Sequence, residues 1–441
     1  MGARRRPLSK DPRVVAAKVI QGVLAGQSLS ELMPRHLEGI DDVRDGGLAQ
    51  EISYGVMRNY PRLSGLARRL LDKPLKAKDR DVEALILVGL YQLLYLRVAE
   101  HAAVHETAGA AKKLGKPWAV GLINGVLRNF LRRREVLMKE VEADPQTRYA
   151  MPEWLLRGIR RRWPSTWQAR VEALNSRPPM SLRVNLSVNS RSDYLQRLEA
   201  EGISARVIPH TQAGLTLEKG LDVTLLPGFS EGRVSVQDGA AQLAAELFDL
   251  KAGQQVLDAC AAPGGKSCHL LEREPELDLT AVDLSPQRLQ RVEENLARLH
   301  LQAEVVAGDA SRPDGAWAGR VYDRILLDVP CSATGVMRRH PDIKLLRREG
   351  DIANLVRLQG EILRAVWPRL AVDGVLLYVT CSILAEENEG QLEDFLAGQA
   401  DAREQPLDVA WGEARSVGRQ VPPGADGMDG FFYACLVKRR L

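Results

Sequence analysis

Apolar residues in the first third of the chain recur at helical spacing, and few segments alternate as strands do. Asp11 and Pro12 supply an N-cap and a first-turn residue before VVAAKVIQGVL. Residues 82–98 are apolar on nearly all sides, as in the central helix of a bundle, and a further helix follows Pro117. We therefore expect an all-α domain over residues 1–140.

The pattern changes over residues 141–233. Residues 181–189 and 205–210 alternate as strands do, and a helical pattern lies between them, which predicts a small α/β module ending near Gly232. Before this module, MPEWLLRGIRRRWPSTWQAR interleaves three tryptophans with five arginines. The tryptophans are Trp154, Trp163 and Trp167. Such a segment can stack on bases and hold phosphates, or it can pack its tryptophans inward, and the sequence leaves both interpretations open.

From about Val234 onward, strand and helix patterns alternate to the end of the chain. Such alternation predicts a mostly parallel sheet covered by helices on both faces, here a Rossmann-like α/β domain over residues 234–441. The predicted fold class is therefore multi-domain: an all-α N-terminal bundle, a small α/β middle module and a C-terminal α/β domain. The predicted strands are QQVLDAC, LTAVD, AEVVAGD, RILLDVPC, GVLLYVTCS and FFYACLVK.

Charge is distributed unevenly along a chain whose composition, 45% hydrophobic and 27% charged, is that of a globular protein. Residues 1–180 carry 32 Lys and Arg against 19 Asp and Glu, whereas residues 181–441 carry 29 against 38. A basic front end on an acidic body favours nucleic-acid binding, and a solvated basic surface is the alternative.

Membrane and targeting signals are absent from the sequence pattern. No segment approaches the roughly 20 apolar residues of a membrane helix. The basic start, MGARRRPLSKDP, is not followed by the apolar core of a signal peptide, and Arg6 breaks the myristoylation pattern. We expect a cytoplasmic protein that does not associate with membranes.

All five cysteines lie in the C-terminal half, and no two of them have C-x-x-C spacing. An odd, sparse set in a long chain predicts free thiols instead of a disulfide framework or a metal site. Buried, unreactive thiols are the usual case, and we expect that environment for Cys268 and Cys435.

The segment Asp258-Ala-Cys-Ala-Ala-Pro-Gly-Gly-Lys266 follows a predicted strand and opens a helix, as a nucleotide-binding turn does. It lacks G-x-G-x-x-G, and a P-loop would need glycine where Cys260 stands. S-adenosylmethionine is the third candidate ligand. Asp283 ends the next strand, where it can meet a ribose, and Asp309 ends a third, where it can meet an adenine. Either acid alone is more often a simple turn residue.

Cys331 and Cys381 each follow a predicted strand, which places both at the carboxyl edge of the sheet beside the cofactor turn. Two thiols at a methyl donor have a chemical purpose. Carbon 5 of cytosine is a poor nucleophile until a thiolate adds to carbon 6. The ring nitrogen N3 must then gain a proton, for which Asp328 is well placed, and a base must later remove the proton from carbon 5.

DACAAPGGK, LLDVPCSATG and YVTCS resemble, in sequence and order, the motifs of the RNA cytosine-C5 methyltransferases over residues 234–441. The resemblance implies that Cys381 is the nucleophile, that Cys331 aids product release, and that Lys266 orients the base beside Asp328. It also implies a set of contacts to S-adenosylmethionine. These residues are Cys260, Ala261, Ala262, Pro263, Gly264, Gly265, Lys266, Asp283, Arg288, Asp309 and Asp328.

The front end, with YGVMRN and INGVLRN, is similar to the antitermination-factor-B-like domain of family members that act on small-subunit ribosomal RNA. MPEWLLRGIRRRWP, RVNLSVN and VQDGAAQLAAELF match their middle segment. The resemblance implies methylation of cytosine 967 of 16S rRNA, as a looped-out or single-stranded base. We expect the protein to be a monomer. The loop MRRHPDIK, residues 337–344, adds basic residues that would hold RNA phosphates. A tRNA substrate and an inert RNA-binding assembly factor are the alternatives.

Overall fold

The computed structural model describes residues 10–440, so most of the basic start predicted to carry no targeting signal lies outside the described residues. Two compact units make up the described chain. The first consists of residues 10–176 together with Met337–Arg348, and the second of residues 177–336 and 349–440. No helix within residues 10–440 has the length and apolarity needed to cross a membrane.

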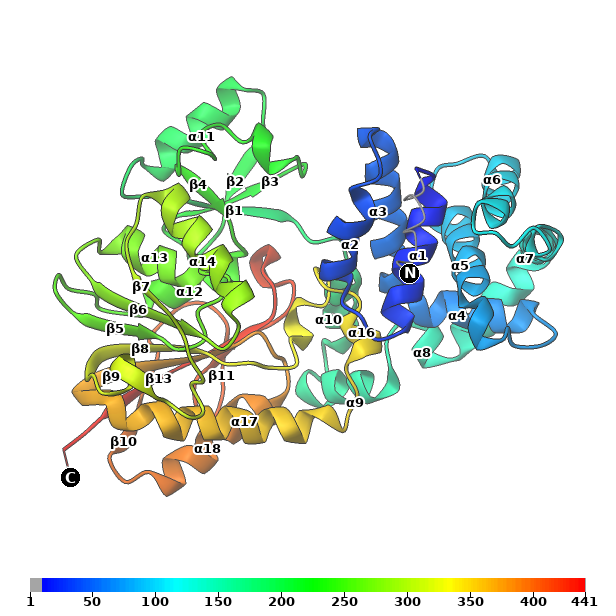
Figure 1. The fold of residues 1–441 in the computed structure, drawn as a ribbon. Coiled ribbons are helices and arrows are strands. Elements are labelled where there is room, and N and C mark those ends of the chain that lie inside the picture. The colour runs from blue at the N-terminus through cyan, green and yellow to red at the C-terminus, as the bar shows by residue number, and fades with distance from the viewer. Residues whose placement is uncertain (1–9, 441) are drawn as a thin grey trace, which may run out of the picture. The chain divides into compact units, whose positions relative to one another are not determined.

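The first unit is helical, and no strand occurs within residues 10–176, which confirms the predicted all-α front end (Figure 1). Asp11 caps the first helix as predicted, since its Oδ1 accepts a hydrogen bond from the backbone N–H of Arg13 at 2.9 Å. The helices are α1 (Pro12–Leu24), α2 (Leu29–Leu37), α3 (Val43–Arg58), α4 (Tyr60–Leu70), η1 (Ala77–Asp79), α5 (Arg80–Tyr95), α6 (Glu100–Lys113), α7 (Ala119–Ala143), α8 (Pro145–Arg148), α9 (Glu153–Arg162), α10 (Trp167–Asn175) and α16 (Ile343–Leu346).

Helix α5 is the buried centre of this bundle, as its apolar sequence predicts, and nearly every residue from Val82 to Leu93 is buried. Close packing requires glycine at two positions around it. A Cβ on Gly55 would lie 2.0 Å from the Tyr91 ring, and one on Gly89 would lie 2.5 Å from Leu127. Where α3, α5 and α7 meet, side chains of one helix therefore pack directly against the backbone of the next.

The tryptophan- and arginine-rich segment forms α9 and α10. Trp163 is only 4% exposed. The Arg160 guanidinium lies 4.5 Å from the centre of the Trp167 ring, and this ring packs edge-on against Tyr149. Since neighbours within the unit cover both rings, the structure favours the inward-packing interpretation for Trp163 and Trp167.

The segment Met337–Arg348 packs with the helices of the first unit. Its Lys344 is 4% exposed, and its ammonium donates to the backbone oxygens of Arg58 at 2.8 Å and Ala150 at 3.2 Å. Burial lowers the pKa of Lys344 to about 7. The side chain of Arg338 is also buried, with 5% of it exposed. The prediction that this loop's basic residues hold RNA phosphates is therefore wrong for Lys344, because its ammonium is buried against backbone oxygens of the same unit.

The second unit begins with a small antiparallel sheet of order β2-β3-β1-β4, with α11 beside it. The first strand is shorter than predicted, because Asn185 accepts a hydrogen bond from the Ser187 N–H at 3.1 Å and turns the chain. Strand β3 was not predicted. The elements are β1 (Met180–Val184), α11 (Arg191–Ala200), β2 (Ala205–Val207), β3 (Gly214–Leu217), η2 (Val223–Leu225) and β4 (Val234–Val236).

Two domain limits expected from the sequence differ from the element limits. Strand β4 pairs with β1, with Leu182 opposite Val236, so this strand belongs to the small sheet and not to the domain that we placed from residue 234 onward. Helix α7 continues to Ala143, past the expected limit at residue 140. A strand of only three residues and a helix end give weak sequence signals, which accounts for both differences.

A nine-stranded sheet dominates the second unit, with β11-β12-β13-β9-β8-β5-β6-β7 in order and β10 paired to β13. Strands β5 to β9 are parallel, and β13 is antiparallel to β9, so the predicted mostly parallel core of the sheet is confirmed. Its elements are β5 (Gln255–Asp258), β6 (Asp278–Asp283), β7 (Glu304–Ala307), β8 (Tyr322–Asp328), β9 (Leu370–Thr380), β10 (Ala402–Gln405), β11 (Glu413–Ala414), β12 (Arg419–Val421) and β13 (Phe431–Lys438).

Helices cover both faces of this sheet. Figure 1 shows α12, α13 and α14 on one face and α17 and α18 on the other, and a separate apolar core lies beneath each set. The helices are α12 (Gly239–Glu246), α13 (Gly265–Arg273), α14 (Pro286–Leu299), α15 (Gly315–Ala318), η3 (Thr334–Val336), α17 (Asp351–Val366), η4 (Trp367–Arg369), η5 (Ala385–Glu387), α18 (Glu389–Gly398) and η6 (Ala425–Gly427).

Candidate active site at the carboxyl edge of the sheet

The residues predicted to carry the chemistry follow the carboxyl ends of neighbouring parallel strands. Asp258, Asp283 and Asp328 are the last residues of β5, β6 and β8, and Asp309 stands two residues after β7. The two cysteine motifs follow β8 and β9. Since the carboxyl ends of parallel strands share one edge, the sheet brings these predicted residues together.

A cavity of about 210 Å³ opens beside the turn between β5 and α13. Gly264 in this turn has a φ of 93°, a left-handed conformation that favours glycine, and a Cβ there would lie 3.1 Å from the Val292 Cα. The turn therefore lies close to α14 and keeps its backbone open to the cavity. The cavity is lined by Val236, Gln237, Ala241, Asp258, Cys260, Ala261, Ala262, Pro263, Gly265, Lys266 and Asp328.

Asp258 gives this cavity a buried polar wall. One carboxylate oxygen accepts a hydrogen bond from the Ser267 hydroxyl at 2.6 Å, and the other has no hydrogen-bond partner in the protein. Burial raises the pKa of Asp258 to about 7, and the nearby Asp328 carboxylate adds to the rise. An oxygen left without a partner beside a cavity fits a ligand that carries hydrogen-bond donors.

Asp283 and Arg288 hold the backbone of the turn. The Asp283 carboxylate accepts from the Ala262 N–H at 3.2 Å, while Arg288 donates to the Ala262 oxygen at 2.8 Å and lies 3.4 Å from Asp283. Asp309 accepts from the hydroxyl of Ser311 at 2.7 Å, which lowers the pKa of the Asp309 carboxyl. Both predicted acids are thus ordered by local contacts, with Asp283 tied directly to the turn.

Lys266 and Asp328 form an ion pair with 2.5 Å between Nζ and Oδ2. The lysine ammonium also lies 5.3 Å from the centre of the Phe431 ring, on strand β13. Burial opposes the charge of Lys266, but Asp328 outweighs it and raises the lysine pKa. The pair therefore offers an ammonium proton and a carboxylate at the same point beside the cavity.

The Sγ atoms of Cys331 and Cys381 lie 3.4 Å apart, within hydrogen-bonding distance for sulfur. This hydrogen bond and burial raise the pKa of Cys331 well above its ordinary value. Cys331 is 9% exposed, and Cys381 is only half-buried. The geometry therefore favours a protonated Cys331 that donates to the more accessible Cys381 sulfur.

A residue that the sequence did not single out, Glu387, joins the two cysteine loops. Its fully buried carboxylate accepts from the Ser332 N–H at 2.7 Å and from the hydroxyls of Ser332 and Ser382, each at 2.5 Å. The Gln359 amide adds a further hydrogen bond at 3.0 Å. Since Ser332 and Ser382 directly follow the two cysteines, Glu387 fixes the spacing of the thiols.

Arg183 on β1 braces the cofactor turn and also went unpredicted. It forms a buried ion pair with Glu272 at 2.7 Å and donates to the Gly265 oxygen at 2.6 Å. The small sheet is thereby tied to α13, whose first turn carries Lys266. No local signal in the sequence links an arginine on a predicted strand to a glutamate 89 residues later.

All five cysteines are free thiols, as predicted. Cys268 and Cys435 are buried, and burial raises the pKa of each to about 12, which agrees with the unreactive environment expected for them. Burial also raises the pKa of Cys260 in the turn well above its ordinary value. Among residues 10–440, no group of three His, Cys, Asp or Glu side chains is arranged to hold a metal ion.

Three family models match successive parts of the chain. The model of the 16S rRNA methyltransferase RsmB/F matches residues 245–437, that of the RsmF/B-like ferredoxin-like domain matches residues 151–224, and that of the NusB family matches residues 10–132. The crystal structure of PH0851 has the same fold, with a TM-score of 0.82 at 22% identity over 98% of this chain and 100% of that chain. These matches confirm the predicted fold class, and S-adenosylmethionine is the cofactor of this group of methyltransferases.

Curated relatives match the chain over almost its whole length. A ribosomal RNA small subunit methyltransferase B from Pseudomonas syringae pv. tomato is 52% identical over 97% of both chains. One from Vibrio cholerae is 50% identical over 96% of both chains. At such identity and coverage, the chain belongs to the ribosomal RNA small subunit methyltransferase B family.

Proposed function

We propose that this protein transfers a methyl group from S-adenosylmethionine to carbon 5 of a cytosine in 16S rRNA, which by resemblance is cytosine 967. The observation that carries the proposal is the pair of thiols 3.4 Å apart at the edge of the sheet that also holds the cofactor turn. Two adjacent thiols suit a covalent adduct with the base, because one thiol can form the adduct and the other can help to break it.

S-adenosylmethionine supplies an electrophilic methyl group when it is bound. Most of the residues proposed to hold it line the cavity, and the unpartnered Asp258 oxygen offers an acceptor for an ammonium or hydroxyl group. Arg288 supports this set by fixing the turn backbone. The proposed contacts are Cys260, Ala261, Ala262, Pro263, Gly264, Gly265, Lys266, Asp283, Arg288, Asp309 and Asp328.

Attack on the base is assigned to Cys381, the more accessible thiol of the pair. Its thiolate forms a bond to carbon 6, and the electron pair of the C5–C6 double bond moves toward N3. A proton from the Asp328–Lys266 pair neutralises the charge that develops on N3. Carbon 5 then has the electron density of an enamine, and Lys266 keeps the ring in position.

Product release is assigned to Cys331. After methylation, N3 returns its proton to the Asp328–Lys266 pair and a general base removes the proton from carbon 5. The electron pair of the C5–H bond re-forms the C5–C6 double bond, the C6–S bond breaks and Cys381 leaves as a thiolate. The Cys331 thiol, which stays protonated because its pKa is raised, donates its hydrogen bond to that departing sulfur. A hydrogen bond to the leaving thiolate favours bond breaking, which accounts for the second cysteine.

The helical front end is proposed to bind the RNA, because residues 1–180 carry a net positive charge. The target base must leave its stack to reach Cys381, so the substrate is a looped-out or single-stranded cytosine. The deciding experiment is mass spectrometry of 16S rRNA and tRNA from a strain that lacks this gene, before and after complementation. We expect one 5-methylcytosine in 16S rRNA to return with the wild type and not with Cys381→Ala. Return of a tRNA methylation instead would contradict the substrate.

A further inference from the structure

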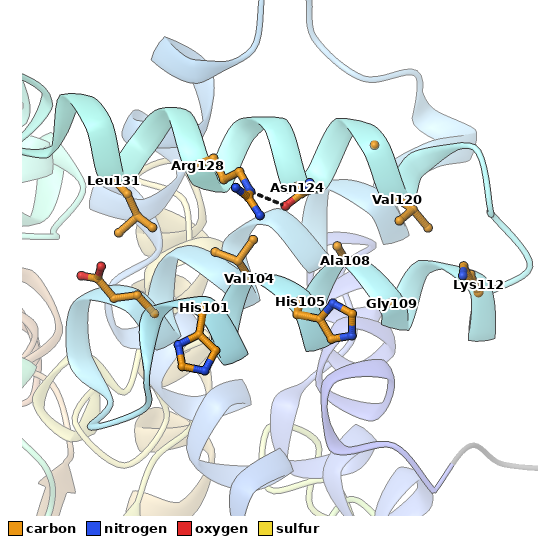
Figure 2. A pocket seen from close by; sticks show the side chains of 12 residues that line it. His101, Val104, His105, Ala108, Gly109, Lys112, Val120, Asn124, Arg128 and Leu131 are labelled. Carbon is orange, nitrogen blue, oxygen red and sulfur yellow. Dashed lines mark hydrogen bonds between the residues drawn. The ribbon is translucent and has the colours of Figure 1, made fainter.

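A cavity of about 500 Å³ lies between α6 and α7 of the helical unit, and Figure 2 shows the side chains that line it. His101, His105 and Lys112 come from α6, and Asn124 and Arg128 come from α7. Its volume is within the roughly 300–1,000 Å³ of pockets that hold small molecules or single nucleotides. We call it the α6–α7 groove.

The charge of the groove favours an anionic ligand. Within residues 10–440, neither Lys112 nor Arg128 makes an ion pair, and Arg128 donates only to its neutral neighbour Asn124, at 3.0 Å. The acidic lining residue Glu100 is matched by Arg134 at 3.3 Å. Two cations therefore face the groove without a protein counter-charge, and the two histidines add further hydrogen-bonding groups.

The backbone of the groove is open at a position where packing does not require glycine. Gly109 lies inside α6, and a Cβ there would meet no atom within 4 Å. Gly55 and Gly89, by contrast, are forced by contacts shorter than 3 Å. A glycine inside a helix costs about 1 kcal/mol relative to alanine, so the open backbone at Gly109 carries a stability cost that contacts within the unit do not explain.

Apolar side chains also line the groove beside its cations, among them Val104, Ala108 and Leu131. Trp118 is not a lining residue, but it is the N-cap of α7, two residues before the lining residue Val120, and it is 56% exposed. An exposed indole near cations is the arrangement that single-stranded nucleic acids use, with bases stacked on aromatic rings and phosphates on Lys and Arg. A protein partner would leave the two cations without acidic partners unless it were itself acidic.

We infer that the α6–α7 groove binds a single-stranded segment of the RNA substrate, with phosphates against Lys112 and Arg128 and a base against Trp118. The open backbone at Gly109 lets the sugar–phosphate chain approach the helix closely. This inference rests on the proposed function, because the RNA that it names is the methylation substrate.

The charge contribution is tested with full-length protein and a fluorescent 16S rRNA fragment that contains cytosine 967. Affinity is measured from low to high salt for the wild type, Lys112→Gln and Arg128→Gln. Removing one cation that neutralises a phosphate of a single strand should reduce the log–log salt slope by about 0.7. Trp118→Ala should weaken binding about fivefold or more at every salt concentration, since stacking depends little on salt.

The shape of the groove is tested with a matched pair of variants. Gly109→Leu places a side chain into the groove. Gly125→Leu is the control, because Gly125 lies on α7 but does not line the cavity, and a Cβ there also meets nothing within 4 Å. Both leucines favour the helix, so neither variant should lower the melting temperature. We expect Gly109→Leu to raise KM for the RNA at least about fivefold with little change in kcat, and Gly125→Leu to change neither.

The outcomes separate this inference from the proposed function. If the wild type methylates the fragment while Gly109→Leu, Lys112→Gln and Arg128→Gln keep its RNA affinity, salt slope and KM, the groove does not bind the substrate and the inference is wrong. If the wild type does not methylate 16S rRNA but the variants lose RNA affinity as expected, the proposed activity fails while RNA binding in the groove stands. An equal rise of KM for the RNA in Gly125→Leu would show a general effect of changes on the helix surface and would also overturn the inference.

Discussion

The Sγ atoms of Cys331 and Cys381 meet at 3.4 Å although 50 residues separate them in the chain. The register of β8 and β9 produces this meeting, since Asp328 lies opposite Val379 and both loops leave the same edge of the sheet. The hydrogen bond makes the two thiols unequal, because it raises the pKa of Cys331. The two cysteines should therefore respond differently to the same substitution.

Cys381→Ala should abolish methylation and form no covalent RNA complex, because the atom that attacks carbon 6 is missing. Cys331→Ala should still attack and accept the methyl group once, but elimination should stall, so a protein–RNA adduct should accumulate. A denaturing gel with labelled RNA and S-adenosylmethionine separates these results. Cys435→Ala, a buried cysteine outside the site, is the control and should turn over normally.

Two outcomes would contradict the assignment of the cysteines. Adducts with Cys381→Ala and none with Cys331→Ala would mean that the two roles are reversed. Normal methylation by Cys381→Ala would rule out covalent catalysis by that thiol, and normal methylation by Cys331→Ala without any adduct would rule out its role in release. Circular dichroism should show that each variant folds, because each change removes only one sulfur atom.

Glu387→Gln should reduce methylation without weakening S-adenosylmethionine binding, because Glu387 touches the cysteine loops and not the cofactor turn. Three donors on Ser332 and Ser382 point at its carboxylate, and a glutamine amide would face at least one of them with an N–H. The mismatch should cost about 1–3 kcal/mol of unfolding free energy. Chemical denaturation measures the loss of unfolding free energy, and the rate of Cys381 alkylation measures the change at the thiol.

An exposed glutamate on the following helix supplies the control for this substitution. Glu393→Gln makes the same change on the surface of α18 and should alter stability by no more than about 0.5 kcal/mol. If both variants alkylate at Cys381 and methylate as the wild type does, Glu387 does not set the spacing of the thiols.

The candidate site was largely predictable because its residues follow strand ends. Apolar runs located β5, β6, β8 and β9, and parallel pairing then required Asp258, Asp283, Asp328 and the cysteine motifs to share an edge. Hydrophobic periodicity likewise located the buried helix α5. Local patterns and the geometry of parallel sheets were sufficient for these features.

Partners distant in the sequence were not predictable. Glu387 looks like any acid at the start of a helix, and its burial follows only from the meeting of two loops. Lys344 stands in a basic run that resembles a solvated loop, yet its ammonium is buried against backbone oxygens of residues 58 and 150. Such pairings depend on tertiary contacts, for which one sequence carries no local signal.

S-adenosylmethionine should stabilise the full-length protein by about 2.7 kcal/mol at a concentration a hundredfold above its dissociation constant. Asp283→Asn should weaken this effect, because it removes the charge that accepts from Ala262 and pairs with Arg288. Titration calorimetry and thermal unfolding measure the two quantities. Asp314→Asn, at an exposed position in the same unit, should bind as the wild type does. Absence of any binding by the folded wild type would refute the assignment of the cavity.

Asp258 should make stability depend on pH between about 4 and 7. Its pKa is raised from 3.8 to about 7 in the folded protein, chiefly by burial, so the folded state holds a proton that the unfolded state has lost. Where the folded state binds more protons, stability falls as pH rises. The contribution of Asp258 is thus fully present below pH 4 and is lost as pH rises through 7, by at most about 1.4 kcal/mol per pH unit.

Asp258→Asn removes this titration, since the amide stays neutral at every pH. The melting temperature of the variant relative to the wild type should therefore increase between pH 5 and pH 7 and then level off, whatever its sign at pH 5. Asp314→Asn, an exposed acid, should show no comparable trend over the same range. A difference for Asp258→Asn that stays constant with pH would mean that the carboxylate is ionised in the folded protein. In that case an unseen donor would have to satisfy the Asp258 oxygen that now lacks a protein partner.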